Sequence, residues 1–281
     1  MLTSTLHTSL STLSAADIVN RIRLGKGPHI PDHRRFALAD FIPLGTPPPS
    51  ANFYQGQTQF GMMLNDVLGD CTCAAVGHAE QVASLNDAPP PEIGTEITVT
   101  DDVIENMYEK SCGYVPGNPF TDNGGIITNV LDWARQHGIG HPGPTHHHRH
   151  RLVAYADPNP ANVTHIKQAI AEFMIVDIGL QLPVTAQAQI GGVWDVVGNP
   201  RTDPDSVPGS WGGHSVVVAE YDVNGLTCIT WGALQAMTWR FWNTYCDEAH
   251  VLFMAALLDR YKMLTAAQLA ILNAQLQALN N

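Results

Sequence analysis

The sequence is poor in charge, and poorest in positive charge. Charged residues make up 14% of the 281 residues, and 14 Lys and Arg stand against 26 Asp and Glu, so that the formal net charge is -12. Phosphate backbones and anionic membrane surfaces are bound by basic patches, which this composition does not favour. We therefore expect neither nucleic acid nor a membrane among the partners of this protein.

Long hydrophobic runs and a cysteine framework are also missing. No apolar run comes near the ~20 residues of a membrane-spanning helix, and the first residues, M-L-T-S-T-L-H-T-S-L-S-T-L, lack the charged start and apolar core of a signal peptide. The 5 cysteines have no framework spacing, and the single residue between Cys71 and Cys73 suits neither an ordinary disulfide nor a zinc knuckle. We expect free thiols in a reducing compartment, and thus a protein of the cytoplasm or of an assembled particle.

Composition and periodicity divide the chain into three zones. Residues 1–50 contain an expected short helix over residues 15–24 and then G-K-G-P-H-I-P-D-H-R-R, which favours an extended arm lying over another surface. Residues 51–262 have the patterns of a folded body, and residues 263–281 predict an amphipathic helix that docks either on its own domain or on a partner. The apolar stripe of that helix consists of Leu269, Leu272, Leu276 and Leu279.

Helical patterns come first within the body, and strand patterns follow. The expected helices cover residues 71–85, 100–112, 125–137 and 166–173. The expected strands cover residues 174–182, 215–221 and 226–231, and the turn D-V-N-G joins the last two into a hairpin. This order predicts an α+β fold.

Three residues lie in the contexts that a thiol hydrolase needs. Cys71 follows a Gly-Asp turn at the start of an alanine-rich helix, where the helix dipole and free N–H groups favour a thiolate. His214 opens the strand pattern H-S-V-V-V-A and can act as the base, while Asn65 can offer its side-chain amide to an oxyanion on the substrate. The three residues predict a cysteine nucleophile whose base comes from a distant part of the chain.

This order of motifs resembles the papain-like cysteine peptidase superfamily, and in its details the peptidase domains that process bacteriocin leaders. Those domains carry an amide residue six positions before the nucleophile, which follows Asp and precedes small residues, as in D-C-T-C-A-A here. A His at the head of a strand and a hairpin ending near Trp-Gly come later, as His214 and Trp231-Gly232 do. The resemblance implies a helical layer whose cysteine helix packs on a C-terminal antiparallel sheet, with residues 51–262 as the papain-like domain. It also implies a peptide or protein substrate, with no cofactor and no metal.

The sequence departs from the pattern of this family at two places. Asn65 stands where Gln is usual, and the Asn or Asp that orients the histidine is missing before Trp231, where the chain has Thr230. A Thr hydroxyl can accept the imidazole N–H, although it stabilises an imidazolium less than a carboxylate does. Glu220 and Asp222 are near in sequence, but strand alternation leaves their directions open. An active enzyme and a degenerate scaffold therefore both stay open.

A histidine run suggests a metal site. His146, His148 and His150 would share one face of a strand and so could bind a divalent ion. However, Arg149 and Arg151 oppose a cation, and no carboxylate or thiolate lies within the run. The preferred interpretation is a solvated or interface-forming segment without a metal.

Three functions follow as hypotheses. In the first, a papain-like cysteine peptidase, Cys71 attacks the carbonyl, His214 relays the proton, Asn65 helps hold the oxyanion, and Thr230 orients His214. The second is a structural or assembly protein, such as a virion or shell protein, on a degenerate peptidase-like fold that self-associates through its arm and C-terminal helix. The third is a non-catalytic module that holds a peptide or glycan.

Overall fold

The computed structural model describes residues 17, 19–32, 35, 37–41, 43, 45–88, 92–94, 96–138 and 151–279. The elements within these residues are α2 (Leu38–Phe41), β1 (Ala51–Asn52), α3 (Cys71–Leu85), α4 (Asp101–Cys112), η2 (Pro119–Thr121), α5 (Ile127–His137), β2 (Leu152–Ala156), α6 (Val163–Phe173), β3 (Val176–Leu182), η3 (Val184–Gln189), β4 (Val193–Trp194), β5 (Gly212–Tyr221), β6 (Gly225–Thr230), β7 (Ala233–Thr238), α7 (Trp239–Tyr245), β8 (Cys246–Met254), α8 (Ala255–Tyr261) and α9 (Ala266–Leu279).

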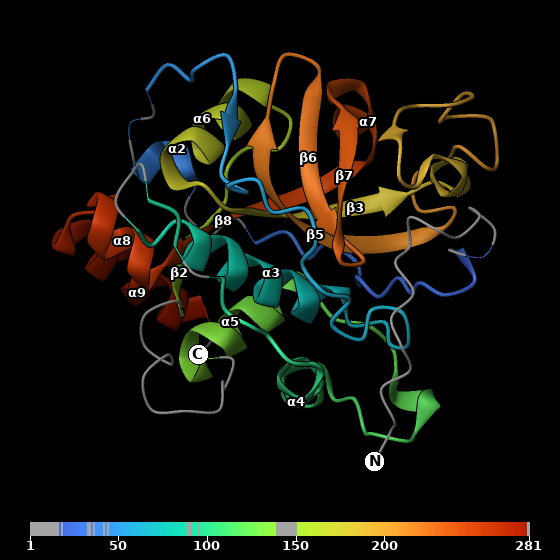
Figure 1. The fold of residues 1–281 in the computed structure, drawn as a ribbon, viewed down its shortest axis with the longest axis horizontal. Helices are drawn as coiled ribbons and strands as arrows, with labels where there is room; N and C mark the ends of the chain where they lie inside the picture. The colour runs from blue at the N-terminus through green and yellow to red at the C-terminus, as the bar shows by residue number, and fades with distance from the viewer. Residues whose placement is uncertain are drawn as a thin grey trace.

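Helix α3 is the centre of the helical layer and is buried along its whole length. Its small residues let neighbouring groups approach closely, since a Cβ on Gly77 would lie 2.6 Å from the sulfur of Met63. The helix packs against β5 on one side and against α4 and α5 on the other, so that it lies between the sheet and these helices in Figure 1. The predicted α+β fold, with the cysteine helix packed on a sheet, is confirmed.

The described residues form an eight-stranded sheet in the order β2-β8-β3-β5-β6-β7-β4, with β1 paired to β5 outside this path. Neighbouring strands are antiparallel except β4 and β7. The predicted strands are confirmed as β3, β5 and β6, whereas β2, β7 and β8 were not predicted. Strand β8 begins C-D-E-A-H, which lacks the hydrophobic alternation that predicts a strand. Its residues Glu248 and His250 are nevertheless buried.

The predicted helices of the body are confirmed with small shifts. Helix α5 begins at Ile127 because Gly125 is still extended and bridges to Lys26. Helix α6 begins at Val163, where the side chain of Asn162 accepts from the backbone N–H groups of the first turn. The helix expected over residues 15–24 is wrong in its second half, since the chain is extended from Ile22 onward.

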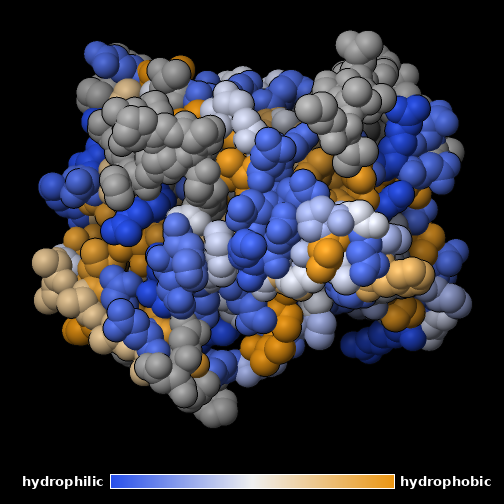
Figure 2. Space-filling view, turned by 90° about the horizontal axis from the view of Figure 1, so that it is seen from below, coloured by the Kyte–Doolittle hydropathy of each residue, from blue (hydrophilic) through white to orange (hydrophobic). Residues whose placement is uncertain are grey.

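The C-terminal helix α9 packs against β2 of its own chain. Leu272 and Leu276 are buried there, whereas Ile271 on another face is 54% exposed. The outer face also carries alanines, so the helix is less amphipathic than its leucine spacing predicts. Figure 2 shows a hydrophobic area at its left edge, the side on which α8 and α9 lie in Figure 1. Within the part of the chain that the structure describes, no helix is long and apolar enough to cross a membrane.

The histidine run, with His146, His148 and His150, lies outside the described residues. Among the residues that are described, no group of three or more His, Cys, Asp or Glu side chains is arranged to hold a metal ion.

Candidate active site

Cys71 is the first residue of α3, and its sulfur contacts the beginning of β5. The backbone N–H of Ser215 donates to Cys71 Sγ at 3.4 Å. Because Ser215 directly follows His214, this contact brings the predicted nucleophile and the predicted base to neighbouring places. The first N–H groups of a helix have no acceptor within the helix, so those at the start of α3 can stabilise an oxyanion.

His214 is held by the hydroxyl of Thr230 and by the indole of Trp231. Its Nε2 lies 2.7 Å from Thr230 Oγ1, and its ring stacks on Trp231 with the centroids 4.6 Å apart. Trp231 has a left-handed backbone with φ 47°, which is uncommon for so bulky a residue. The second ring nitrogen of His214, Nδ1, is buried without a hydrogen-bond partner among the described residues. This arrangement fixes the ring through Nε2 and leaves Nδ1 for proton transfer.

Burial keeps both groups of the pair uncharged in this conformation. It raises the pKa of the Cys71 thiol to about 12, against the hydrogen bonds from the backbone of Ser215 and Gly25. Burial also lowers the pKa of His214 to about 3, and the charge of His78 adds to this effect. The sequence predicted a thiolate, so that prediction is wrong for this state. Desolvation of the sulfur outweighs the helix dipole.

Asn65 is bonded within its own loop. Its Nδ2 donates to the carbonyl of Leu68 at 3.2 Å and to Asp70 Oδ1 at 3.1 Å. Asp70 is fully buried, which raises the pKa of its carboxyl well above the usual value. Asn65 therefore shapes the turn that leads into Cys71, and its amide can reach an oxyanion only after one of these bonds breaks.

Residues 22–27, here called the strap, cross the start of α3 and of β5. On the sheet side, the backbone N–H of Lys26 donates to the carbonyl of Gly213 at 3.0 Å. On the helical side, the N–H of Gly27 donates to the carbonyl of Gly125 at 2.7 Å. The strap thus joins the two layers over the pair of Cys71 and His214.

Glycines let the strap lie this close to the body. A Cβ on Gly25 would lie 1.7 Å from the carbonyl oxygen of Gly69, and a Cβ on Gly124 would lie 2.0 Å from the carbonyl oxygen of Gly25. The N–H of Gly125 donates to that same carbonyl at 2.7 Å. No side chain fits at Gly25 unless the strap moves away.

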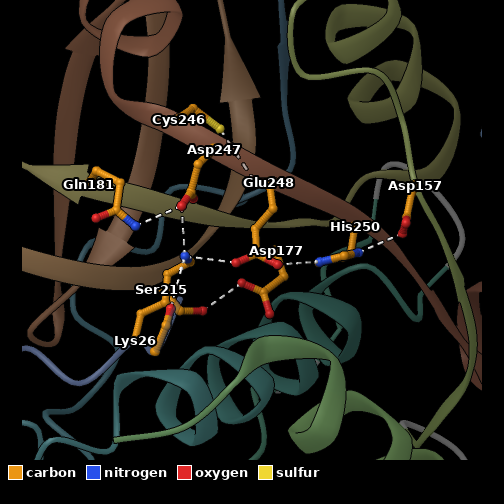
Figure 3. Close-up of polar contacts among 10 residues, drawn as sticks. Lys26, Asp157, Asp177, Gln181, Ser215, Cys246, Asp247, Glu248 and His250 are labelled. Atoms are coloured by element: carbon orange, nitrogen blue, oxygen red, sulfur yellow. Dashed lines mark hydrogen bonds and ion pairs between the residues drawn. The ribbon is translucent and has the colours of Figure 1, made fainter. Parts of the chain in front are cut away.

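The side chain of Lys26 is buried over the sheet, and the space that it fills is here called the lysine slot; Figure 3 shows its polar contacts. The slot lies over Gly179 of β3, which is paired with Ser215 of β5 on one side and with Glu248 of β8 on the other. A Cβ on Gly179 would lie 2.2 Å from Lys26 Cε. The Nζ atom lies 2.8 Å from Glu248 Oε1 and 3.0 Å from Asp247 Oδ2, and the lysine side chain is 0% exposed.

Further charged groups extend from the slot along β8, as Figure 3 shows. His250 Nε2 lies 3.2 Å from Glu248 Oε2, and His250 Nδ1 lies 2.6 Å from Asp157 Oδ1. Burial alone would raise the pKa of Glu248, but His250 and Lys26 lower it to about 2. Burial alone would lower the pKa of His250, but Asp157 and Glu248 raise it to about 10. Glu248 and His250 are therefore both ionised although they are buried.

An open groove of about 410 Å³ runs along the strap. Residues 23–26 of the strap line it together with Gly69, residues 122–124 and residues 211–213. Asp122 accepts from the N–H of Gly69 at 3.0 Å and from the hydroxyl of Tyr108 at 2.7 Å. It therefore ties the turn before Cys71 to α4.

The remaining candidates lie apart from the histidine. Glu220 is paired with Asn52 at the other end of β5, and Asp222 accepts from the N–H of Asn224 in the hairpin turn at 2.7 Å. Thr230, not one of these carboxylates, meets Nε2 of His214. His78, farther along α3, lies with its Nε2 3.1 Å from the carbonyl oxygen of Gly61.

The sequence interpretation missed the strap lysine and the acids that bind it. One signal was present: Lys26 stands between two glycines in a chain that has only 14 Lys and Arg. The adjacent acids Asp247 and Glu248, two positions before His250, were the second signal. Neither reveals by itself that these distant segments meet.

No protein-family profile matches the sequence, and no curated protein is significantly similar to it. Among solved structures, the cysteine protease xylellain from Xylella fastidiosa matches with a TM-score of 0.57 and 15% identity, over 83% of this chain and 96% of that chain. The ragweed Amb a 11 cysteine protease in its proform matches with a TM-score of 0.55 and 12% identity, over 86% and 77%. Digestive procathepsin L 3 from the Tenebrio molitor larval midgut matches with a TM-score of 0.53 and 12% identity, over 86% and 79%. The fold is therefore that of the papain-like cysteine proteases.

Proposed function

We propose that this protein is a papain-like cysteine hydrolase that cleaves peptide bonds, and that the strap holds it in a latent state. The observation that supports this best is the position of Cys71. Its sulfur is at a helix N-terminus, within hydrogen-bond distance of the residue after His214, whose ring is held at Nε2 by Thr230. The proteases named by the structural matches agree with this chemistry.

Each residue of the site has a separate role in the proposed reaction. His214 Nδ1 takes the proton of Cys71 as Sγ attacks the substrate carbonyl carbon, and the backbone N–H of Cys71 donates to the oxyanion. The protonated His214 then gives its proton to the leaving amine, and water hydrolyses the thioester. Thr230 accepts from Nε2–H throughout and keeps the ring in position. Asn65 adds a second donor if its turn opens.

The strap accounts for the uncharged state of the pair. While it covers the site, burial dominates both pKa values. Once it leaves, water reaches the sulfur and the imidazole, and the helix N-terminus and the base then favour the thiolate. Two of the matched proteases are described in precursor form, which is the state that this arrangement supports here.

We also propose three finer features of the function. The sequence around Cys71 suggests substrates like those of leader-processing peptidases, and the arm and α9 suggest self-association. A cytoplasmic location is proposed from the composition alone. The assembly-protein alternative needs a site that stays inert after the strap is removed, so one experiment separates it from the enzyme.

The experiment uses Gly25→Val in the full chain, because a side chain at this position collides with the carbonyl of Gly69 and expels the strap. Gly192→Val is the control, since Gly192 is exposed and a Cβ there meets only Gln189 O at 3.5 Å. We expect Gly25→Val to hydrolyse a fluorogenic protein substrate such as labelled casein. The double variant Gly25→Val/Cys71→Ala should be inactive and should have the same melting temperature as Gly25→Val. A folded Gly25→Val protein whose Cys71 reacts with iodoacetamide but which cleaves nothing would refute the hydrolase.

A further inference from the structure

We propose that the lysine slot is the specificity pocket of this enzyme, and that it accepts a Lys or Arg side chain of the substrate close to the scissile bond. The inference rests on the proposed function, and it names the substrate class that the site selects. Lys26 of the strap then occupies the place of a substrate side chain.

The slot opens beside the nucleophile. Ser215, whose N–H donates to the sulfur of Cys71, is the strand partner of Gly179 at the base of the slot. The backbone of Gly25, the residue before Lys26, lies close enough to that sulfur to lower the pKa of the Cys71 thiol. A side chain that enters the slot therefore belongs to a residue within about two positions of the bond that Cys71 attacks, since consecutive Cα atoms are about 3.8 Å apart.

The shape of the slot suits a long, unbranched side chain. Gly179 has no side chain at the base of the slot, and the methylene groups of Lys26 occupy the space that a side chain at position 179 would take. The acids lie at the far end, so that a side chain must be as long as lysine to reach them (Figure 3). Lys26 Nζ has two acceptors in the slot, Glu248 Oε1 and Asp247 Oδ2, and a third in the strap itself, the carbonyl of Gly27.

The charges around the slot require a cation. Asp247 also accepts from Gln181 Nε2 at 2.7 Å, and Glu248 is bonded to His250. With Lys26 withdrawn, His250 is the positive charge that remains beside Asp157 and Glu248, and the buried carboxyl of Asp177 lies close by, bonded to Ser215. An apolar side chain in the slot would leave Glu248 and Asp247 without the cation that they contact here, and an acidic one would add to the repulsion.

The backbone of the strap shows how a peptide can lie in the site. The carbonyl of Gly213 and both backbone groups of Gly125 hold the strap on either side of Lys26. These groups remain when the strap leaves, so an extended peptide can form hydrogen bonds with them and place its own side chain in the slot.

The test compares two fluorogenic peptides that differ only in one residue, lysine or norleucine, placed one or two positions before the cleaved bond. With Gly25→Val we expect kcat/KM at least tenfold higher for the lysine peptide. Glu248→Gln in that background should reduce the ratio to near one. Glu220→Gln, an acid at the far end of β5, should leave the ratio unchanged. Equal cleavage of both peptides would overturn the pocket while leaving the hydrolase intact.

Binding separates the pocket from the hydrolase. In Gly25→Val/Cys71→Ala, which cannot turn over substrate, the lysine peptide should bind at least tenfold more tightly than the norleucine peptide. This preference without any turnover in Gly25→Val would support the pocket and contradict the hydrolase.

A second measurement does not depend on release of the strap. Lys26→Ala lacks the four outer atoms of the lysine side chain, which n-propylammonium reproduces. We expect this cation to raise the melting temperature of Lys26→Ala more than 1-propanol or sodium ions do, and to have no such effect on the wild type. An equal response to all three additives would show that the slot does not recognise an alkylammonium group, and the proposal would fail.

Discussion

Two neighbouring regions under the strap are equally buried but ionise in opposite ways. Cys71 and His214 are uncharged, because desolvation moves their pKa values to about 12 and about 3. Glu248 and His250 are charged, with pKa values of about 2 and about 10, although they lie equally deep. The difference is in the partners. Each charge on β8 faces an opposite charge, whereas Cys71 and His214 contact the backbone N–H of Ser215, the hydroxyl of Thr230 and the indole of Trp231. Burial alone therefore does not decide ionisation.

The largest expected effect is on the reactivity of Cys71. When Gly25→Val expels the strap, the pKa of the thiol falls from about 12 toward the ordinary 9.0, which raises the thiolate fraction at neutral pH about a thousandfold. Alkylation by iodoacetamide, followed at Cys71 by peptide mapping, measures the rate. Gly192→Val should behave as the wild type. Equal rates in all three proteins would mean that the strap does not control the thiol.

Removing the lysine of the slot breaks the charged region. Lys26→Met keeps the side chain as far as the ε position but leaves Glu248 and Asp247 without the lysine cation, and we expect the free energy of unfolding to fall by about 3–5 kcal/mol. Urea denaturation at pH 7 measures the change. Lys110→Met, at a lysine whose side chain is 57% exposed, is the control and should cost less than about 0.5 kcal/mol. A similar small cost for both variants would contradict the importance of the buried pair.

The pH dependence of stability should depend on His250. Its folded pKa is raised from 6.5 to about 10, so its stabilising contribution is complete below pH 6.5 and is lost as the pH rises toward 10. Glu248, lowered from 4.5 to about 2, acts in the opposite direction and loses its contribution only as the pH falls from 4.5 toward 2.

We expect His250→Gln to be less stable than the wild type at pH 6 by roughly 1–3 kcal/mol, with the difference shrinking by pH 10. Urea unfolding at pH 6, 8 and 10 tests this. A difference that stays constant over this range would mean that His250 is not protonated in the folded protein.

The smallest expected effect concerns Thr230. Thr230→Val removes one neutral hydrogen bond of His214, worth about 1 kcal/mol, so kcat in the Gly25→Val background should fall roughly fivefold. KM should stay the same, and Thr230→Ser should retain activity because it keeps the hydroxyl. An equal loss in the serine variant would point to packing of the threonine methyl group instead.

The parts of the fold that were predictable depend on local signals. Helix α3 follows from the Gly-Asp turn and the run of small residues after Cys71, and the hairpin of β5 and β6 follows from Asn224-Gly225. Thr230 was found by its place before Trp231, which is also local. Strand β8 was not predicted, because its acids and histidine read as surface residues until their partners are known.

The roles within the site were less predictable. The helix position of Cys71 suggested a thiolate, but burial among residues distant in sequence raises the pKa of the thiol to about 12. The amide of Asn65 looked free, but the buried carboxyl of Asp70 accepts from it. In both cases a group outside the local pattern changes the role of the residue.

The sequence by itself determined the candidate residues of the site: a cysteine at the start of a helix, a histidine at the head of a strand and a threonine before Trp-Gly. Only the tertiary structure decided the state of these groups and the identity of the slot. Lys26 and Asp247 are 221 positions apart, and ionisation depends on the solvent and charges within a few ångströms, which the order of residues along a chain does not specify.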